Sequence, residues 1–101
     1  MALAILIAPA ARAITGKQYD GKLETARTLI GCRWVESQRV SNRGDMLFFD
    51  EEGLLKARPG PFFVLLDRPY PYAGRALIVG PEEEGIYLTT QLDPTISIDL
   101  V

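Results

Sequence analysis

The chain has 101 residues, of which 48% are hydrophobic, which suffices for a single domain spanning residues 1–101 with a modest core. A formal net charge of −2 excludes a strongly basic nucleic-acid-binding protein and a strongly acidic mimic of DNA. The absence of histidine removes histidine-dependent catalysis and most zinc sites, and the single cysteine cannot form an internal disulfide. We therefore expect a cytoplasmic protein without a cofactor.

The first thirteen residues, MALAILIAPAARA, imitate a signal peptide, because an apolar run precedes Ala11-Arg12-Ala13. No basic residue comes before the run, and Arg12 lies inside the supposed cleavage motif, so we reject this interpretation. The run is also too short to span a bilayer, which takes about 20 residues, and we expect no membrane association. Residues 2–8 are apolar at both alternating sets of positions and therefore predict a central strand.

The segment 21–31 is the only one with a clear helical period. Leu23, Ala26, Leu29 and Ile30 fall on one stripe, which predicts a short helix that packs on a sheet. Asp20 is placed to cap its first amides, and Gly31 to end it in the left-handed conformation. Before this helix, residues 11–15 predict a short edge strand and residues 16–20 a polar loop.

The rest of the chain reads mainly as strands. Residues 32–40 and 46–50 predict a hairpin around the turn 41–44, and residues 54–56 could extend it. Residues 62–66 fit either a short edge strand or a packed irregular loop. Further strands are expected at 74–80, at 86–90 after a turn at 81–85, and at 95–100. The predicted class is α+β, with one short helix packed on a mainly antiparallel sheet of about five to seven strands.

Two features of the sequence resemble catalytic or metal-binding groups. Cys32 follows the end of the helix, where the dipole disfavours a thiolate, so we interpret it as a structural core cysteine. The acidic tetrads 50–53 and 82–85 lack the spaced, convergent oxygen ligands of a cation site, and we interpret them as solvated turns. We therefore expect neither an enzyme nor a metal site.

A loop between residues 58 and 72 carries the strongest signal for protein binding. Arginine and tyrosine are enriched among binding hot spots, and the prolines limit the entropy lost when the loop is ordered. The predicted partner-binding residues are Arg58, Arg68, Tyr70 and Tyr72. The same loop could instead fold over an uncovered face of the sheet through its phenylalanines.

Basic residues outnumber acidic ones between Arg12 and Arg43, where Tyr19 and Trp34 lie among them. Aromatic side chains on a basic face can stack on nucleic-acid bases. The alternative partner is therefore a nucleic acid that binds Arg33, Arg39 and Arg43. Dispersed surface charges would explain the same pattern.

Several stretches together resemble a family of small domains of unknown function that occur in phages, plasmids and other mobile elements. They are the apolar N-terminal strand ending at Pro9, the helix exit from Leu23-Glu24 to Leu29-Ile30-Gly31, the strand and turn at 49–53, and the strand at 73–80. The sequence departs from the family at Phe49-Asp50, where asparagine often precedes the acidic turn, and in the proline-rich segment 62–72. The resemblance implies an α+β fold and a mobile-element setting, and it assigns no catalytic residues.

The leading hypothesis is a non-catalytic protein-binding module, encoded by a mobile element as an inhibitor or accessory factor, for example in counter-defence. The runner-up is a nucleic-acid-binding accessory protein. Residues 95–100 form a strand with one apolar face, which predicts either a symmetric homodimer through that strand or a monomer in which it pairs within its own sheet.

Overall fold

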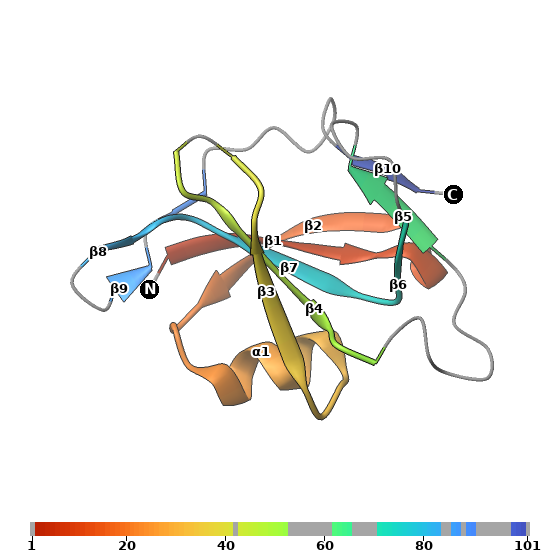
Figure 1. Ribbon diagram of the computed structural model, residues 1–101, viewed down its shortest axis with the longest axis horizontal. Helices are drawn as coiled ribbons and strands as arrows, with labels where there is room; N and C mark the ends of the chain where they lie inside the picture. The colour runs from red at the N-terminus through yellow and green to blue at the C-terminus, as the bar shows by residue number, and fades with distance from the viewer. Residues whose placement is uncertain are drawn as a thin grey trace.

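The computed structural model of the protein describes residues 2–41, 43–52, 62–65, 71–83, 86–87, 89–90 and 98–100. Its main element is a five-stranded sheet in which every neighbouring pair is antiparallel (Figure 1). The strand order is β2-β1-β7-β4-β3, with β1 at Ala2–Ala8, β2 at Ala13–Tyr19, β3 at Val35–Arg39, β4 at Met46–Asp50 and β7 at Ala76–Val79. The α+β class is confirmed, and the main sheet has five strands rather than as many as seven.

Strand β1 lies between β2 and β7, which confirms the prediction of a central strand. Its side chains alternate between two apolar layers: Ile5 and Ile7 belong to one core cluster, and Ala4 and Leu6 to the other. A strand that is buried on both faces must be apolar at consecutive positions, as this one is.

Helix α1 (Leu23–Ile30) covers one face of the sheet and packs against β7 and β4. Ala26 and Ile30 are buried there, whereas Leu29 is only partly buried. Leu23 is 50% exposed, so the predicted stripe was too wide at its first residue. Gly31 ends the helix at φ 78°, as predicted, and its amide donates to the Arg27 carbonyl.

The start of α1 differs from the prediction in one detail. The N-terminal cap is Lys22, which makes no side-chain capping bond. Asp20 lies two residues earlier, where its carboxylate accepts the Lys22 amide and the Thr25 hydroxyl. Asp20 therefore fixes the turn into the helix rather than capping the amides of the helix itself.

A small three-stranded sheet packs on the other face, in the order β10-β5-β6. It consists of β5 (Phe62–Leu65), β6 (Pro71–Ala73) and β10 (Ile98–Leu100). Phe63, Leu65 and Tyr72 join the core cluster that contains Ile5 and Ile7, on the face opposite α1. In the view of Figure 1 the helix lies below the main sheet and β5 and β10 lie above it. Residues 62–65 are thus a strand, and they form the middle of their sheet rather than an edge.

Three predicted boundaries were wrong. Strand β2 continues to Tyr19, so residues 16–19 are strand instead of polar loop, because β1 supplies a partner for every residue of it. The hairpin strand β3 begins at Val35 and not at residue 32. Strand β7 pairs with β1 and β4. Among the described strands, β9 (Ile86–Tyr87) pairs with β8 (Glu82–Glu83), a segment that had been predicted as a turn.

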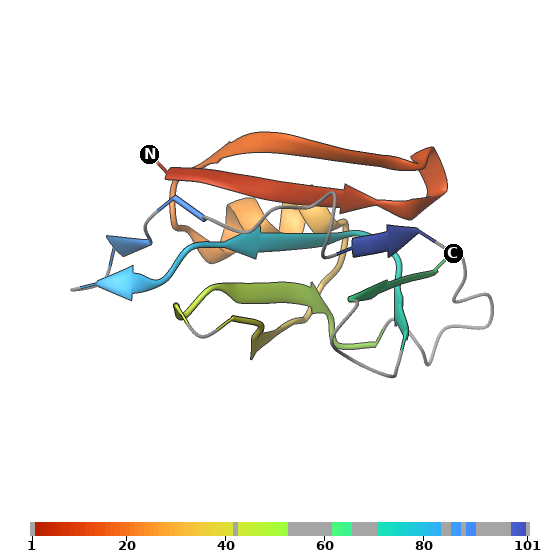
Figure 2. The same ribbon diagram turned by 90° about the horizontal axis from the view of Figure 1, so that it is seen from above.

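A buried polar clip joins the β3–β4 hairpin to the start of β1. Asp45 is 1% exposed, and its carboxylate accepts hydrogen bonds from the hydroxyls of Ser41 and Thr90. The Thr90 amide in turn donates to the Leu3 carbonyl at 3.1 Å. The clip explains why the turn at 41–44, which was correctly predicted, is held against a segment far along the chain. Figure 2 shows β1 and the β3–β4 hairpin on opposite sides of β7.

Several predictions lie outside the described residues. These are the extension of the hairpin at 54–56, the break at 58–61, and the first part of the last strand at 95–97.

Candidate functional site

Of the four predicted partner-binding residues, Tyr72 is the one that the structure describes. Tyr72 lies in β6 and is 5% exposed. Its ring stacks on Phe63 with centroids 5.2 Å apart and meets Phe49 edge-on, while its hydroxyl donates to the side-chain oxygen of Gln38. Tyr72 is therefore a core residue, and its assignment to partner binding was wrong. Arg58, Arg68 and Tyr70 lie outside the described residues.

The three arginines predicted to bind nucleic acid are exposed but do not form one patch. Arg39 and Arg43 lie at the turn end of the β3–β4 hairpin, whereas Arg33 precedes the opposite end of β3. Six residues of extended chain separate Arg33 from Arg39, or roughly 20 Å. Tyr19, one of the two predicted stacking residues, is 3% exposed and packs edge-on against Phe48.

Trp34 is the large aromatic side chain that the described surface exposes, with 49% of it accessible. With the residues that the structure describes, it makes no ring contact and no side-chain hydrogen bond. Its backbone carbonyl accepts the amide of Glu51 at 3.0 Å, which holds Trp34 in register with the end of β4. The indole is therefore exposed on a backbone that is firmly paired.

Among the described strands, β3 is the last one of the main sheet on this side. Its pairing pattern shows which backbone groups face outward. Trp34 bonds to Glu51, and Val40 donates to the Asp45 carbonyl at 2.8 Å. In an antiparallel ladder the hydrogen-bonded pairs alternate, so Glu36 and Gln38 also direct their backbone groups toward β4. The amides and carbonyls of the residues between them, Val35, Ser37 and Arg39, point away from the sheet.

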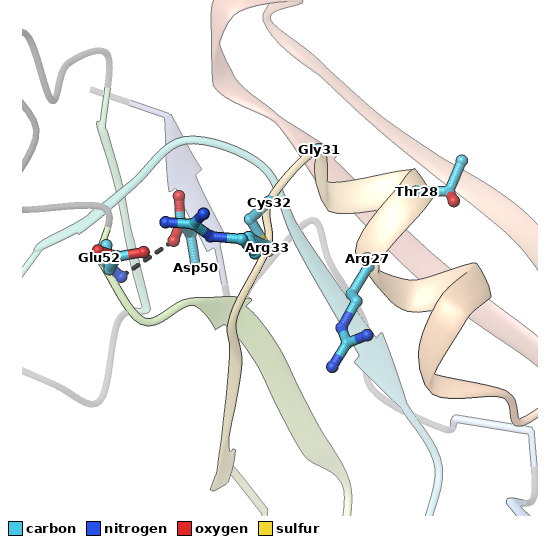
Figure 3. Close-up of a pocket in the computed structure, with 7 residues that line it drawn as sticks. All are labelled: Arg27, Thr28, Gly31, Cys32, Arg33, Asp50 and Glu52. Carbon is cyan, nitrogen blue, oxygen red and sulfur yellow. Dashed lines mark hydrogen bonds between the residues drawn. The ribbon is translucent and has the colours of Figure 1, made fainter.

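An open cleft of about 540 Å³ lies between the end of α1 and the start of the β3–β4 hairpin. Its lining comes from both elements and from the link between them: Arg27, Thr28, Gly31, Cys32, Arg33, Asp50 and Glu52. The Asp50 carboxylate accepts the amide of Glu52 at 2.9 Å, which is the turn chemistry expected for the first acidic tetrad. In Figure 3, Arg27 and Thr28 leave the helix on opposite sides.

Three arginines around this cleft have no carboxylate partner among the residues that the structure describes. With those residues, Arg27, Arg33 and Arg75 form no ion pair or side-chain hydrogen bond, and the Nε atom of Arg27 is buried without an acceptor. The Arg75 guanidinium lies against Gly31, where a Cβ would stand 2.3 Å from one of its nitrogens. Glycine is thus favoured at position 31 by its positive φ, whereas the Arg75 guanidinium is the far end of a flexible side chain and could shift to admit a Cβ.

Cys32 lines the same cleft and packs, partly buried, against the core cluster on the helix side. This position agrees with the structural role predicted for it. Arg27 and Arg33, the two cations that could activate it, both line the cleft with it. No base that could take up the proton of its thiol lines the cleft apart from the carboxylates Asp50 and Glu52.

Sequence reasoning found this site only in part. Trp34 was predicted as a stacking residue on a basic face, but its position at the edge of the sheet was not predicted, and Arg27 was not among the predicted site residues. The signal for Arg27 lay in its spacing, since it falls one residue after buried Ala26 and therefore flanks the buried stripe.

Comparisons with protein-family models, curated proteins and solved structures found no match to the chain. The resemblance to domains of mobile elements therefore stays a prediction. Among the described residues, no helix is long and apolar enough to cross a membrane, and no three potential ligands are grouped as a metal site.

Proposed function

We propose that the protein is a non-catalytic protein-binding module whose partner adds an extended segment to the outer edge of β3. The observation that supports this proposal is the position of Trp34, a half-exposed indole that immediately precedes β3. The next outward-facing backbone groups of that strand, those of Val35 and Ser37, bond to no described residue. In strand addition, main-chain hydrogen bonds provide affinity, and contacts to alternate side chains provide specificity.

Trp34 would supply most of the apolar contact. Covering its exposed half removes on the order of 100 Å² of apolar surface from water, which favours binding by roughly 2–3 kcal/mol. Tryptophan is also among the residues most enriched at binding hot spots. Because the backbone of Trp34 is already bonded to Glu51, little backbone conformational entropy is lost when a partner binds the indole.

The opposite edge of the sheet is a weaker candidate. Strand β2 exposes Gly16 and Lys17 along its length and carries no exposed aromatic residue. Glycine weakens a strand, and an edge lysine opposes pairing with a further strand. The β3 edge therefore offers an exposed aromatic side chain to an added strand, whereas the β2 edge offers a glycine and a lysine that disfavour pairing.

The wider role that we propose is that of an inhibitor or accessory factor encoded by a mobile element. The support for it is the resemblance described above. Capture of a host protein from lysate, with and without nuclease treatment, tests this role. A partner that survives nuclease treatment supports protein binding, whereas a partner lost with the nucleic acid contradicts it.

The edge itself is tested by a pair of proline substitutions. Ser37→Pro removes an amide that points away from the sheet, so the fold should lose less than about 1 kcal/mol while partner capture is abolished. Gln38→Pro removes an amide that bonds to β4 and should destabilise the fold by about 3 kcal/mol. Equal destabilisation by the two variants would show that the outward face of β3 is misassigned, and capture that survives in a folded Ser37→Pro variant would overturn the proposal.

A second test removes the indole. Trp34→Ala should reduce capture at least tenfold, because a half-exposed side chain contributes more to binding than to folding. Its melting temperature, measured beside that of wild type, separates lost binding from lost structure. Retained capture would mean that the partner binds elsewhere.

Nucleic acid is the second candidate partner, and the exposed neighbours Arg33 and Trp34 favour it. In this case affinity for a single-stranded oligonucleotide should fall steeply with salt. Charge reversal at Arg33, Arg39 and Arg43 should then abolish binding. Binding that is absent or independent of salt would remove this candidate.

A further inference from the structure

We infer that the segment that docks on β3 carries an arginine opposite Glu36, with its guanidinium between the Glu36 carboxylate and the Trp34 indole. The inference rests on the proposed strand addition and specifies the chemistry of the partner. It follows from the charges around the exposed indole and from the position at which an added strand comes closest to β3.

The chain neighbours of Trp34 and Glu51 show on which side of the sheet the indole lies. Arg33 and Asp50 line the cleft on the helix side, and in Figure 3 the side chain of Arg33 extends toward Asp50. Side chains alternate between the two faces of paired, extended chain, and the Glu51 amide bonds to the Trp34 carbonyl. Trp34 and Glu51 therefore lie on the face away from the helix. Glu36 lies on the same face, because the next residue before it, Val35, packs on the helix side.

Two carboxylates flank the indole on this face. Glu51 is directly opposite Trp34 across the pairing of β3 with β4, which places their Cβ atoms about 5 Å apart. Glu36 follows two residues later on the same strand, or about 7 Å along it. Both glutamates are exposed, and neither forms an ion pair with the residues that the structure describes.

The described arginines nearest to this face do not neutralise the two glutamates. Arg33 lines the cleft on the helix side. Arg39 lies on the face of β3 that carries Val35, and its Nε atom donates to the Ser41 carbonyl at 3.1 Å. An exposed indole between two carboxylates without a described cation is a surface that a positively charged partner complements.

An added strand comes closest to β3 at Glu36. The backbone groups of Glu36 point toward β4, so on the outer side Glu36 lies between the free groups of Val35 and Ser37 at a position without hydrogen bonds. In an antiparallel pair such positions bring the two Cα atoms to about 4.5 Å, closer than the hydrogen-bonded positions do. An arginine there reaches the Glu36 carboxylate directly and the Trp34 indole diagonally. Its planar guanidinium pairs with a carboxylate and stacks on an aromatic ring, which the ammonium of lysine does less well.

The test uses short capped peptides that alternate threonine and valine and carry arginine, citrulline or glutamate at the central position. Citrulline has nearly the shape of arginine without its charge. Calorimetric titration should show that the arginine peptide binds about tenfold more tightly than the citrulline peptide, and that the glutamate peptide binds most weakly. The advantage of arginine should shrink as salt is added. Ser37→Pro should abolish binding of all three peptides.

Glu36→Gln should lower the affinity for the arginine peptide toward that for the citrulline peptide, which itself should not change. Glu82→Gln is the matched control, because it removes the same charge from an exposed strand of another sheet and should leave the preference intact. Equal affinity of wild type for the arginine and citrulline peptides would overturn the inference and leave strand addition standing. A preference for arginine that survives Glu36→Gln would do the same.

Failure of every peptide to bind would also overturn the inference, and lysate capture that is indifferent to Ser37→Pro would overturn strand addition with it. An oligothymidylate that binds more tightly than the arginine peptide would overturn the inference in favour of nucleic acid, because Glu36 and Glu51 should repel its phosphates.

Discussion

Arg27 is partly buried, and its aliphatic stem ends in a buried Nε donor that has no acceptor. Methionine keeps much of that stem and removes the donor. We predict that Arg27→Met raises the free energy of unfolding by about 1 kcal/mol, as measured by denaturant unfolding. The gain would show that the guanidinium of Arg27 does not stabilise the fold. A loss of stability would instead mean that its guanidinium supports the fold.

The pKa of Asp20 lies below its ordinary value of 3.8, first because its carboxylate accepts the Lys22 amide and second because it accepts the Thr25 hydroxyl. A depressed pKa means that the folded state favours the ionised form. The contribution of Asp20 to stability is therefore complete above pH 3.8 and is lost as the pH falls through its lower, folded value.

We predict that a carboxyl titration followed by NMR gives Asp20 a midpoint below 3.8, and that Thr25→Ala moves this midpoint upward. The remaining amide bond from Lys22 should keep the midpoint of the variant below the ordinary value. An unchanged midpoint in the variant would show that the hydroxyl does not hold the carboxylate in solution.

Aromatic residues show how far single side chains could be predicted. Tyr19 and Tyr72 were considered as contact residues, and both are buried, because the strands that carry them face core clusters assembled from distant segments. Trp34 was likewise considered as a contact residue, and it is half exposed. Residue type sets how much surface an aromatic ring can bury, but which face its strand presents depends on long-range register that no local pattern contains.

Helix α1 buries a narrow stripe of side chains, so its residues should differ sharply in how much they contribute to the stability of the fold. Ile30 is 4% exposed, and Ile30→Ala should cost roughly 2–4 kcal/mol of stability. Leu23 is half exposed at the first turn, and Leu23→Ala should cost less than about 1 kcal/mol. Thermal or denaturant unfolding of the two variants measures both losses of stability, and the loss for Ile30→Ala should be the larger one. Similar costs would mean that the helix is rotated relative to the sheet.

Among the elements, those with a strong local pattern were predicted and those that depend on a partner were not. The strand at 2–8 is apolar on both faces, and the helix ends at a glycine, so both were found in the sequence. Residues 16–19 of β2 have a composition typical of a loop and form a strand only because β1 lies alongside them. The candidate site escaped prediction for the same reason, since an edge exists only relative to the strand order of the whole sheet.

At the scale of the whole molecule, β10 bears on the state of assembly. It pairs with β5 on one side and ends the small sheet on the other, as far as the described strands extend. We predict a symmetric dimer in which the β10 strands of two copies pair. Sedimentation equilibrium at micromolar concentration should give twice the chain mass, and deletion of residues 97–101 should return it to the chain mass. A monomer that is unaffected by the deletion would contradict the prediction, and Ser37→Pro serves as a control that leaves a β10 dimer intact.

The place of β7 in the sheet governs how the protein folds. The two local hairpins, β1–β2 and β3–β4, touch within the main sheet only through β7, which is made from residues 76–79. An isolated two-stranded hairpin is marginal in water, so neither half of the sheet persists until this late segment arrives. During synthesis, the N-terminal strand β1 therefore cannot pair with its second neighbour until the last third of the chain has been made. Folding should accordingly be slow and cooperative. The amides of β7 should accordingly exchange with solvent only through global unfolding, at a rate set by the stability of the entire domain.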